Sequence, residues 1–417
     1  MMRAVDVVVI GAGAAGLSAA PGPAATREVI VLSAGDGSTP WAHGGGSVAF
    51  GEDDPLDHAH DTYVAAAGFC DPRNVRALVE ERPQRVTELI AHGALYRRED
   101  GSLSRTLEGG HGHPRIVHAG GDATGVEVCR ALHAAVCAAG VETMAGRTIG
   151  LTKSDSGRVN GVVVEAGGVA SRIEAHTVVL ATGGIGNAYL ASTNPSAVRG
   201  DGMAIALLAG ASPVDMEFVQ VHPTALFTGE APGQLPLVTE AVRGERAVLR
   251  DARGRLIMAG RPSGADLAPR DIVAREIEAA MRRDGSDHVW LDARSIEPDA
   301  LRRQFPTVQA SCASIGVDLQ SEQIPVATAE QFLCGGVQVD RDSATGVPGP
   351  PSTRTACRQP AARRGRRHGW DRGRGPSDSF PLPPAALTSQ GPRRHHIGSP
   401  SFTRDWMPRG RAAASVS

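Results

Sequence analysis

The sequence lacks the features that would place a chain in a membrane or an export pathway. No apolar run reaches the roughly 18 residues that cross a bilayer. The first residues lead directly into an apolar strand pattern, so we expect no signal peptide. The sequence therefore predicts a protein of the cytoplasm with no membrane partner.

Cysteine is scarce and scattered along the chain. The six cysteines form no CxxC pair and lack the spacing of metal ligands. A chain of 417 residues is long enough for two or three cores and has no need of a disulfide framework. We therefore expect reduced thiols and no metal site. The cysteines are Cys70, Cys129, Cys137, Cys312, Cys334 and Cys357.

Lysine is almost absent, since Lys153 is the only one among 43 basic residues. Arginine carries the remaining positive charge and is unevenly spread, because residues 351–417 hold 13 Arg against 3 Asp. Such a segment has the electrostatics to attract nucleic acid. It has neither a fold pattern nor an aromatic platform, however, so we expect no nucleic-acid partner.

The first 33 residues follow the order strand, glycine turn, helix, strand. Residues 5–10 and 28–33 are short apolar runs of the kind that form buried parallel strands. Pro21 and Pro23 fall in the segment between them, which predicts a short or broken helix. This order is typical of a dinucleotide-binding βαβ unit.

A GxGxxG motif, Gly11-Ala12-Gly13-Ala14-Ala15-Gly16, fills the first turn of this unit. Its first glycine permits a tight turn, its second lets the backbone approach a pyrophosphate, and its third lets the helix pack closely. The free N–H groups of the helix start then favour a phosphate. The strand ends at Ser33 rather than at the usual acidic residue, so Asp36 is either a ribose ligand or an ordinary loop aspartate.

Further motifs resemble the L-aspartate oxidase family and its succinate dehydrogenase and fumarate reductase relatives. Ser38-Thr39-Pro40-Trp41-Ala42-His43-Gly44-Gly45 is similar to the flavin loop S-T-x-x-A-Q-G-G. Leu107-Glu108-Gly109-Gly110-His111-Gly112-His113 resembles the signature R-E-G-G-H-S. The motifs ATGG, TNP, HPT, TEA and APRD follow in the order of the family at residues 181–184, 193–195, 222–224, 239–241 and 268–271.

Two residues favour the amino-acid oxidases within this group. Ser38 stands where the respiratory enzymes carry the histidine that bonds to flavin, which implies non-covalent FAD. The resemblance places Glu108 near the amino group of the substrate. A carboxylate there can pair with an ammonium, whereas it would repel a plain dicarboxylate.

The resemblance also implies the roles of individual residues. Oxidation of L-aspartate by hydride transfer to FAD would give iminoaspartate, the first step of NAD biosynthesis through quinolinate. Oxygen or fumarate would then reoxidise the flavin, and quinolinate synthase is an implied partner. Arg270 and His222 would hold the substrate carboxylates, Arg270 would also transfer a proton, and His111, His113 and His118 are interpreted as structural. The catalytic set is Arg270, His222 and Glu108, the substrate set adds Gln220, Thr239 and Glu240, and the cofactor set is Gly11, Ala12, Gly13, Ala14, Ala15, Gly16, Ser33, Ser38, Thr39, Ala42, His43, Gly44, Gly45 and Asp201.

These patterns together predict an α/β fold. Residues 1–214 and 331–349 would form an FAD-binding Rossmann-like domain, with helices at 73–100 and 123–140 and paired strands at 158–166 and 171–181. Residues 215–330 mix short strands and helices and predict an inserted α+β capping domain. The Arg-, Pro- and Gly-rich residues 350–417 predict a disordered tail unrelated to the family.

The chain departs from the family pattern at two places. Gln331 stands where the family has a substrate-binding histidine. After Gly349 the expected strand and the segment HGANR are missing, which suggests a frameshift in the gene or its sequencing near this codon. We expect an open apolar edge where that strand would pair, and a purified chain that is unstable or free of flavin. An inactive remnant and a fumarate reductase-like flavoprotein are therefore the alternatives to an active oxidase.

Overall fold

The computed structural model describes residues 3–229, 233–260, 265–340, 343–348 and the backbone of 356–357. The chain divides into two compact units, Met1–Arg364 and Gly365–Ser417. The second unit and most of the predicted disordered tail lie outside the described residues.

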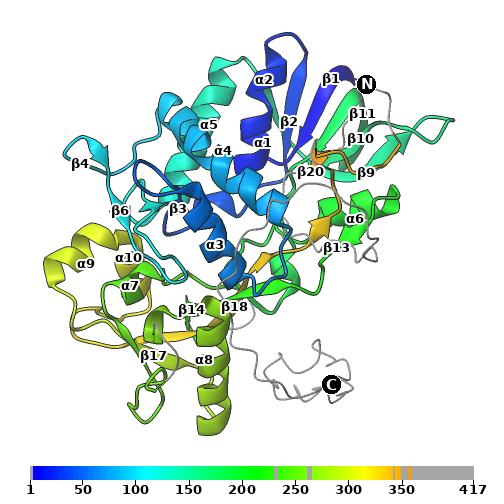
Figure 1. Ribbon diagram of the computed structural model, residues 1–417. Coiled ribbons are helices and arrows are strands. Elements are labelled where there is room, and N and C mark those ends of the chain that lie inside the picture. The colour runs from blue at the N-terminus through cyan, green and yellow to red at the C-terminus, as the bar shows by residue number, and fades with distance from the viewer. Residues whose placement is uncertain (1–2, 230–232, 261–264, 341–342, 349–355, 358–417) are drawn as a thin grey trace, which may run out of the picture. The chain divides into compact units, whose positions relative to one another are not determined.

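A seven-stranded sheet forms the centre of the first unit (Figure 1). Its middle strand β1 (Arg3–Ile10) lies between β2 (Val29–Ser33) and β11 (Val169–Leu180), and the three run parallel. The predicted βαβ unit is therefore confirmed. The other strands are β8 (Glu142–Ala145), parallel to β2, then β10 (Val159–Ala166) and β9 (Arg147–Lys153), antiparallel beyond β11, and β20 (Ala356–Cys357).

The edge beside the carboxyl end of β11 differs from the expectation. We predicted that this edge would be open, but β20 pairs with Val179 and Leu180 in parallel register. Ladder hydrogen bonds come from the backbone, so two residues can pair there without the side chains of the family strand.

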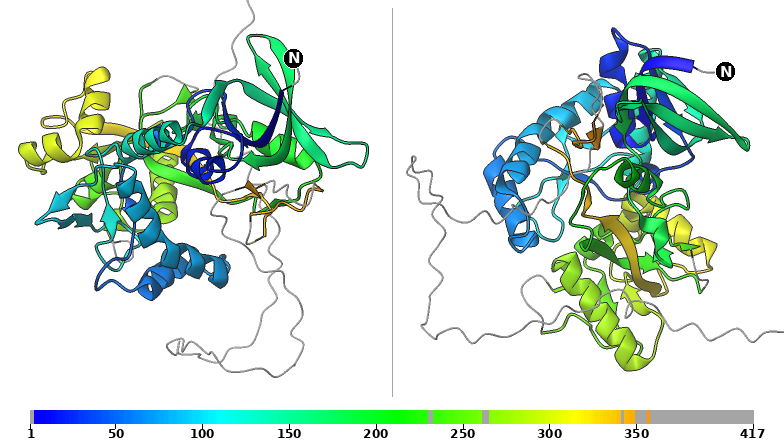
Figure 2. Two further views of the ribbon diagram at one scale, coloured as in Figure 1. Left: turned by 90° about the horizontal axis from the view of Figure 1, so that it is seen from above. Right: turned by 90° about the vertical axis from the view of Figure 1, so that its right-hand side faces the viewer.

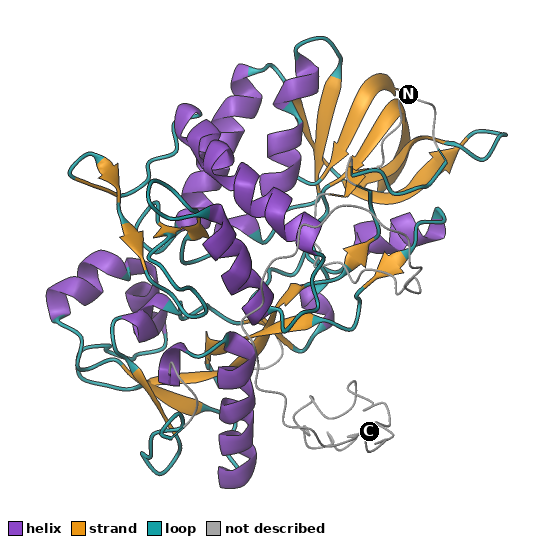
Figure 3. Cartoon of the chain, in the orientation of Figure 1, coloured by secondary structure: helices purple, strands orange, loops and turns teal. Residues whose placement is uncertain are grey.

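Helices cover one face of this sheet (Figure 3). The crossover is split into α1 (Ala14–Ala19) and α2 (Pro21–Ala24), as the two prolines predicted. Val7 and Val9 of β1 point to this face and pack against Leu17 of α1. Leu132 and Val136 of α5 (Thr124–Ala138) complete the same cluster.

The opposite face is buried as well, as expected for a parallel sheet. Val8 and Ile10 point to it and pack in one cluster with Met203 and Ala206 of α6 (Asp201–Leu208). Leu333, at the end of β18 (Ile324–Leu333), joins this cluster. The cluster thus ties the two sheets of the unit together.

A six-stranded sheet carries the second core. Long helix α8 (Arg270–Asp284), yellow-green in Figure 2, runs beside its strands and buries Val273 and Ile277 against Leu291 and Ile324. β12 (Ala191–Ser192) also pairs in this sheet, although it precedes residue 215, where we expected the capping domain to begin. The division of the chain at residues 214 and 330 stays a prediction. The other elements are β14 (Val219–Leu226), β15 (Gly233–Gln234), β16 (Val248–Arg250), β17 (Val289–Asp292), α7 (Ala241–Gly244), α9 (Pro298–Gln304) and α10 (Pro306–Ser314).

The helix predicted over 73–100 is shorter in the structure. α4 (Pro72–Ala91) ends just before Gly93, which has φ +87°. The amide of Gly93 donates to the carbonyl of Ile90, and that of Ala94 donates to Leu89. A glycine in the left-handed region ends a helix in this way because no other residue adopts it at so little cost.

The remaining elements lie outside the two large sheets. α3 (Pro55–Ala65) packs on α4 through Ala59, Val75 and Val79. The others are β3 (Gly46–Ser47), β4 (Arg98–Glu99), β5 (Ser102–Leu103), β6 (Arg105–Thr106), β7 (Ile116–Val117), β13 (Pro213–Val214), β19 (Gly336–Val337), and the 3-10 turns η1 (Thr39–Trp41), η2 (Gly186–Ala188) and η3 (Ala265–Leu267).

Candidate cofactor and substrate site

A cavity of about 190 Å³ lies at the carboxyl ends of β1, β2 and β11. Ligands of open α/β sheets bind at this edge. Eight of the fourteen predicted cofactor residues form its wall, but Gly16, Ser33, Ala42, His43, Gly44 and Gly45 do not. Ser33 instead donates a hydrogen bond to the carbonyl of Gly35, and Gly35 belongs to the cavity wall. The wall includes Gly11, Ala12, Gly13, Ala14, Ala15, Ser38, Thr39 and Asp201, with Asp36, Arg147, Thr148 and Thr182 beside them.

The glycines of the turn have two different roles. Gly11 has φ +111°, and a Cβ on it would overlap the carbonyl oxygen of Ala181. A Cβ on Gly16 would overlap the carbonyl oxygen of Gly11. Gly13 instead borders the cavity, and a Cβ there would meet only Thr39 Oγ1, at 3.3 Å. The turn thus keeps backbone N–H groups open to the cavity, which fits a phosphate of FAD.

The predicted flavin loop is fixed at several points along its length. Ser38 Oγ donates to Asn194 Oδ1 at 2.5 Å, and Thr39 Oγ1 accepts from the amide of Ala14 at 3.0 Å. The carbonyl of Ala42 accepts from the amide of Gly125 at 3.0 Å. These contacts hold the loop between α1, α5 and β12.

Asp201 lies in the cavity wall at the start of α6. Its Oδ2 accepts from Arg147 Nε at 2.7 Å and lies 3.5 Å from Arg199 Nη2. The hydrogen bond from Arg147 lowers the pKa of Asp201 below its ordinary value. Asp201 is therefore an ionised group beside the cavity.

The predicted substrate residues gather around Arg270, the first residue of α8. Its Nε donates to Glu240 Oε2 at 2.7 Å, and its Nη1 donates to Gln220 Oε1 at 3.2 Å. Nη1 also donates to Gln331 Oε1 at 3.0 Å. Four residues from β14, the start of α7, α8 and β18 thus meet at one guanidinium group.

Arg243 extends this cluster into the interior. Its side chain is fully buried, its Nη2 lies 3.6 Å from Glu240 Oε2, and its Nη1 donates to the carbonyl of Asp266. Burial lowers the pKa of Arg243, while Glu240 acts in the opposite direction. Arg243 follows the TEA motif by two residues, but we assigned it no role, because sequence does not show that a guanidinium is buried.

Glu108 approaches the same cluster from the other side. Burial, and then the charge of Glu240, raise its pKa to about 7. A Cβ on Gly44 would lie 3.5 Å from Thr239 Oγ1 and 3.8 Å from Glu108 Oε1. The last part of the flavin loop therefore lies directly against two predicted substrate residues.

His222 is fully buried and neutral in character. Its Nδ1 accepts from the amide of Thr224 at 3.1 Å, so the proton belongs on Nε2. Burial lowers its pKa well below the ordinary value, and Arg270 and Arg243 act in the same direction. Burial also lowers the pKa of His43 in the flavin loop.

Several polar atoms of the cluster are buried without a hydrogen-bond partner in the described part of the chain. They are the donors His222 Nε2 and Arg243 Nε and Nη2, and the acceptor Glu108 Oε1. Buried polar atoms normally have partners, so a group of unpaired ones indicates a place for a ligand. Unpaired donors together with an unpaired carboxylate oxygen fit a small molecule with both acidic and basic groups.

The three other predicted histidines make contacts with the protein. His118 Nε2 lies 2.7 Å from Thr106 Oγ1, and the exposed His113 lies 3.8 Å from Asp57. His111 Nδ1 lies 3.5 Å from Arg115 Nη1. The structural interpretation of these histidines stays a prediction.

Histidine burial predicts loss of stability in mild acid. Burial lowers the pKa of His58 to about 4, whereas the unfolded chain takes up this proton near pH 6.5. The free energy of unfolding should therefore fall by up to about 1.4 kcal/mol per pH unit from this histidine between pH 6.5 and 4. Urea unfolding midpoints at pH 7 and 5 measure this loss, and His58→Gln should reduce it.

His113→Gln is the control for this measurement, since the His113 side chain is 55% exposed. It should leave the difference between pH 7 and 5 unchanged. Equal pH dependence of the His58→Gln variant and the unsubstituted chain would contradict the prediction.

The chain matches known proteins over most of its described length. A family model described as an FAD binding domain matches residues 6–352. The L-aspartate oxidase of Streptomyces coelicolor is 49% identical over 359 residues, 83% of this chain and 62% of that protein. The L-aspartate oxidase of Caulobacter vibrioides is 41% identical over 352 residues, 82% of this chain and 68% of that protein.

Solved structures agree with these sequence relatives. An E. coli quinol fumarate reductase chain superimposes with a TM-score of 0.75 at 29% identity, covering 83% of this chain and 63% of that one. The chain thus spans a little under two thirds of several of these relatives. In the part that the structure describes, we find no helix with the length and apolar character to cross a membrane.

Proposed function

Because the chain belongs to the L-aspartate oxidase family of FAD-binding proteins, we propose that it oxidises L-aspartate to iminoaspartate with non-covalent FAD. The observation that supports this activity most directly is the set of unpaired buried atoms around Arg270. His222 Nε2 and Arg243 can donate to carboxylates, and Glu108 can pair with an ammonium group. A plain dicarboxylate would leave Glu108 unpaired.

Arg270 is the residue that we propose holds one substrate carboxylate. Its Nε and Nη1 are occupied by Glu240, Gln220 and Gln331, which fix the plane of the guanidinium. Nη2 has no protein partner among the described residues and can donate to the substrate. A planar guanidinium held in this way presents its donor in one direction, which a flexible ammonium group does not.

The proton released from the substrate would leave through the protein. Arg270 contacts Glu240 at 2.7 Å, and Glu240 lies 3.6 Å from Arg243, so the three groups form a continuous ionic chain. Bound FAD would supply the electron acceptor for the C–N oxidation. The cofactor would lie between the glycine turn and the loop from Ser38 to Gly45, which brings it to the substrate cluster at Gly44.

Glu108 predicts the pH dependence of substrate capture. With a pKa of about 7, its carboxyl is neutral in mild acid and becomes an anion as the pH rises. Only the anion pairs with an ammonium group, so kcat/KM for L-aspartate should rise with pH through about 7. Glu108→Gln should remove this rise and lower kcat/KM for L-aspartate about 10-fold or more. A rise of the same size in the Glu108→Gln variant would contradict the assignment.

The experiment that tests the activity is anaerobic reduction. The chain is purified, its visible spectrum is recorded with added FAD, and L-aspartate is then mixed in without oxygen. Bleaching of the flavin band by L-aspartate, and not by succinate, would support an oxidase. Bleaching by succinate alone would favour a fumarate reductase-like flavoprotein.

A remnant without turnover is the second candidate, and Gln331 favours it. This residue accepts a hydrogen bond from Arg270 where the resemblance implies a cationic histidine. A chain that binds FAD but is not bleached by either substrate, or that binds no FAD, would support the remnant. For an active chain we propose oxygen or fumarate as electron acceptor and quinolinate synthase as the enzyme that receives the product. Its place in the cytoplasm stays a prediction.

A further inference from the structure

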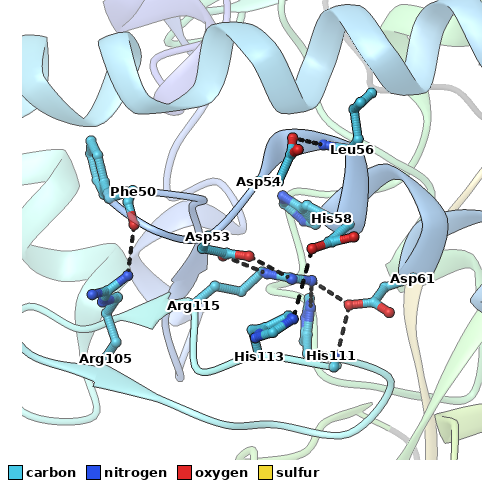
Figure 4. A network of polar contacts seen from close by, with 12 residues as sticks. Phe50, Asp53, Asp54, Leu56, His58, Asp61, Arg105, His111, His113 and Arg115 are labelled. Carbon is cyan, nitrogen blue, oxygen red and sulfur yellow. Dashed lines mark hydrogen bonds and ion pairs between the residues drawn. The ribbon is translucent and has the colours of Figure 1, made fainter.

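The loop that carries Glu108 lies beside a buried ion-pair network that the proposed mechanism does not use (Figure 4). Arg115, just before β7, is 0% exposed and contacts two carboxylates. Its Nε and Nη2 donate to Asp53 at 2.9 Å each, which is a bidentate pair. Its Nη1 donates to Asp61 on α3.

Asp61 joins this network to the loop itself. Its Oδ2 accepts from the backbone amide of Gly112 at 2.8 Å as well as from Arg115. Burial acts against ionisation of Asp61, but the Gly112 amide and Arg115 together lower its pKa. The Asp61 carboxylate is thus a fixed anion that holds two points of one loop, Gly112, four residues before β7, and Arg115, one residue before it.

The loop of residues 108–112 has little stiffness of its own. It contains Gly109, Gly110 and Gly112, and Gly110 has φ +81°. Glycine loses more conformational freedom on ordering than any other residue, so such a loop needs external contacts. Glu240 Oε1 accepts from the amide of Gly109 at 3.1 Å and fixes the other end.

The surroundings of the network make it a rigid support. His58 of α3 is buried at 4% exposure, and its ring centroid lies 5.8 Å from that of His111. Figure 4 shows both rings next to the Arg115 guanidinium. Burial and Arg115 lower the pKa of both histidines, so they pack as neutral rings beside the ion pairs.

We propose that Asp61 and Arg115 are positioning residues that set the selectivity of the site for an amino dicarboxylate. They do so by holding the loop of residues 108–112, and with it Glu108, against the substrate cluster. The inference rests on the proposed function, because it assigns to Glu108 the role of pairing with the substrate ammonium group. It adds two residues that do not touch the substrate.

The test compares Asp61→Asn and Arg115→Lys with the unsubstituted full chain. His60→Gln is the control, since His60 lies on α3 next to Asp61 and its side chain is exposed. Hydrogen–deuterium exchange of residues 107–115 is measured first, without any ligand. We expect faster exchange in Asp61→Asn and Arg115→Lys and unchanged exchange in His60→Gln.

The second readout is the ratio of dissociation constants for succinate and L-aspartate, measured in excess FAD. Asp61→Asn should weaken L-aspartate binding about 10-fold, the effect of one charge-assisted hydrogen bond, and succinate binding less than about twofold. In a Glu108→Gln background, Asp61→Asn should change this ratio no further. A merely structural loss would weaken both ligands alike.

Two results would overturn the proposal. One is unchanged exchange of residues 107–115 in Asp61→Asn. This variant decides, because it should fold more readily than Arg115→Lys, which leaves a lysine among the buried carboxylates. The other is that Asp61→Asn changes the ratio of dissociation constants for succinate and L-aspartate equally with Glu108 present and in the Glu108→Gln background. Failure of the proposed function is distinct, because the unsubstituted chain would then show no preference for L-aspartate. In that case the exchange measurement alone still decides whether Asp61 and Arg115 hold the loop.

Discussion

Arg270→Lys is expected to lower the turnover of L-aspartate by about 1,000-fold or more while leaving FAD binding unchanged. Three hydrogen bonds, to Glu240, Gln220 and Gln331, hold the guanidinium of Arg270 in one plane. Lysine keeps the charge but supplies one point donor on a flexible stem, so it cannot keep these contacts and also bind substrate. It also breaks the ionic chain through Glu240 to Arg243.

The measurement is the rate of flavin reduction by L-aspartate after rapid anaerobic mixing, together with the FAD dissociation constant. Arg275→Lys is the matched control, since Arg275 lies on the same helix in an exposed pair with Asp271 and should behave as the unsubstituted chain. If L-aspartate reduced the flavin of the Arg270→Lys variant at a rate within about tenfold of the unsubstituted rate, Arg270 would lose its catalytic assignment. Loss of FAD binding would show that its role is structural.

The parts of the fold that sequence predicted are those that local rules determine. The strand before Gly11, the turn and the split crossover at Pro21 and Pro23 depend on residues within one short segment. The end of α4 was missed, although Gly93 is a recognisable helix-ending signal. An apolar pattern that continued past this glycine outweighed it in our interpretation.

The contacts within the site could not be predicted in the same way. Gln331 illustrates this, because we interpreted it only as the replacement of a substrate-binding histidine by a neutral residue. In the structure its amide oxygen accepts from Arg270, which lies 61 residues earlier in the chain. A side-chain contact over this separation depends on how β18 passes the start of α8, and no local pattern encodes it.

Asp61 and Arg115 were missed for a related reason. Each is one charged residue among many in the sequence, and 54 positions separate them. What distinguishes Arg115 is burial, since its side chain is 0% exposed. A buried guanidinium needs carboxylate partners, so one observation of burial would have led directly to the network.

Gly16→Ala is expected to destabilise the chain by about 3 kcal/mol and to abolish tight FAD binding. The added Cβ would overlap the carbonyl oxygen of Gly11, which is backbone and cannot rotate away. Relief requires α1 to move away from the turn, but Leu17 on the next position is buried between Val7 and Val9 of the sheet. The turn and the start of α1 would therefore lose the geometry with which they line the cavity and hold Thr39 through the Ala14 amide.

Gly150→Ala is the control, because Gly150 lies within β9 of the same sheet, has no positive φ, and a Cβ there would have nothing within 4 Å. This substitution should be neutral or stabilise by up to about 1 kcal/mol, since alanine loses less conformational freedom on folding than glycine does. Urea unfolding gives the free energy of both variants, and the quenching of FAD fluorescence gives their affinity. A Gly16→Ala chain as stable as Gly150→Ala would mean that the turn tolerates a side chain at its third glycine, and the close helix–strand approach would then not be needed for the cofactor site.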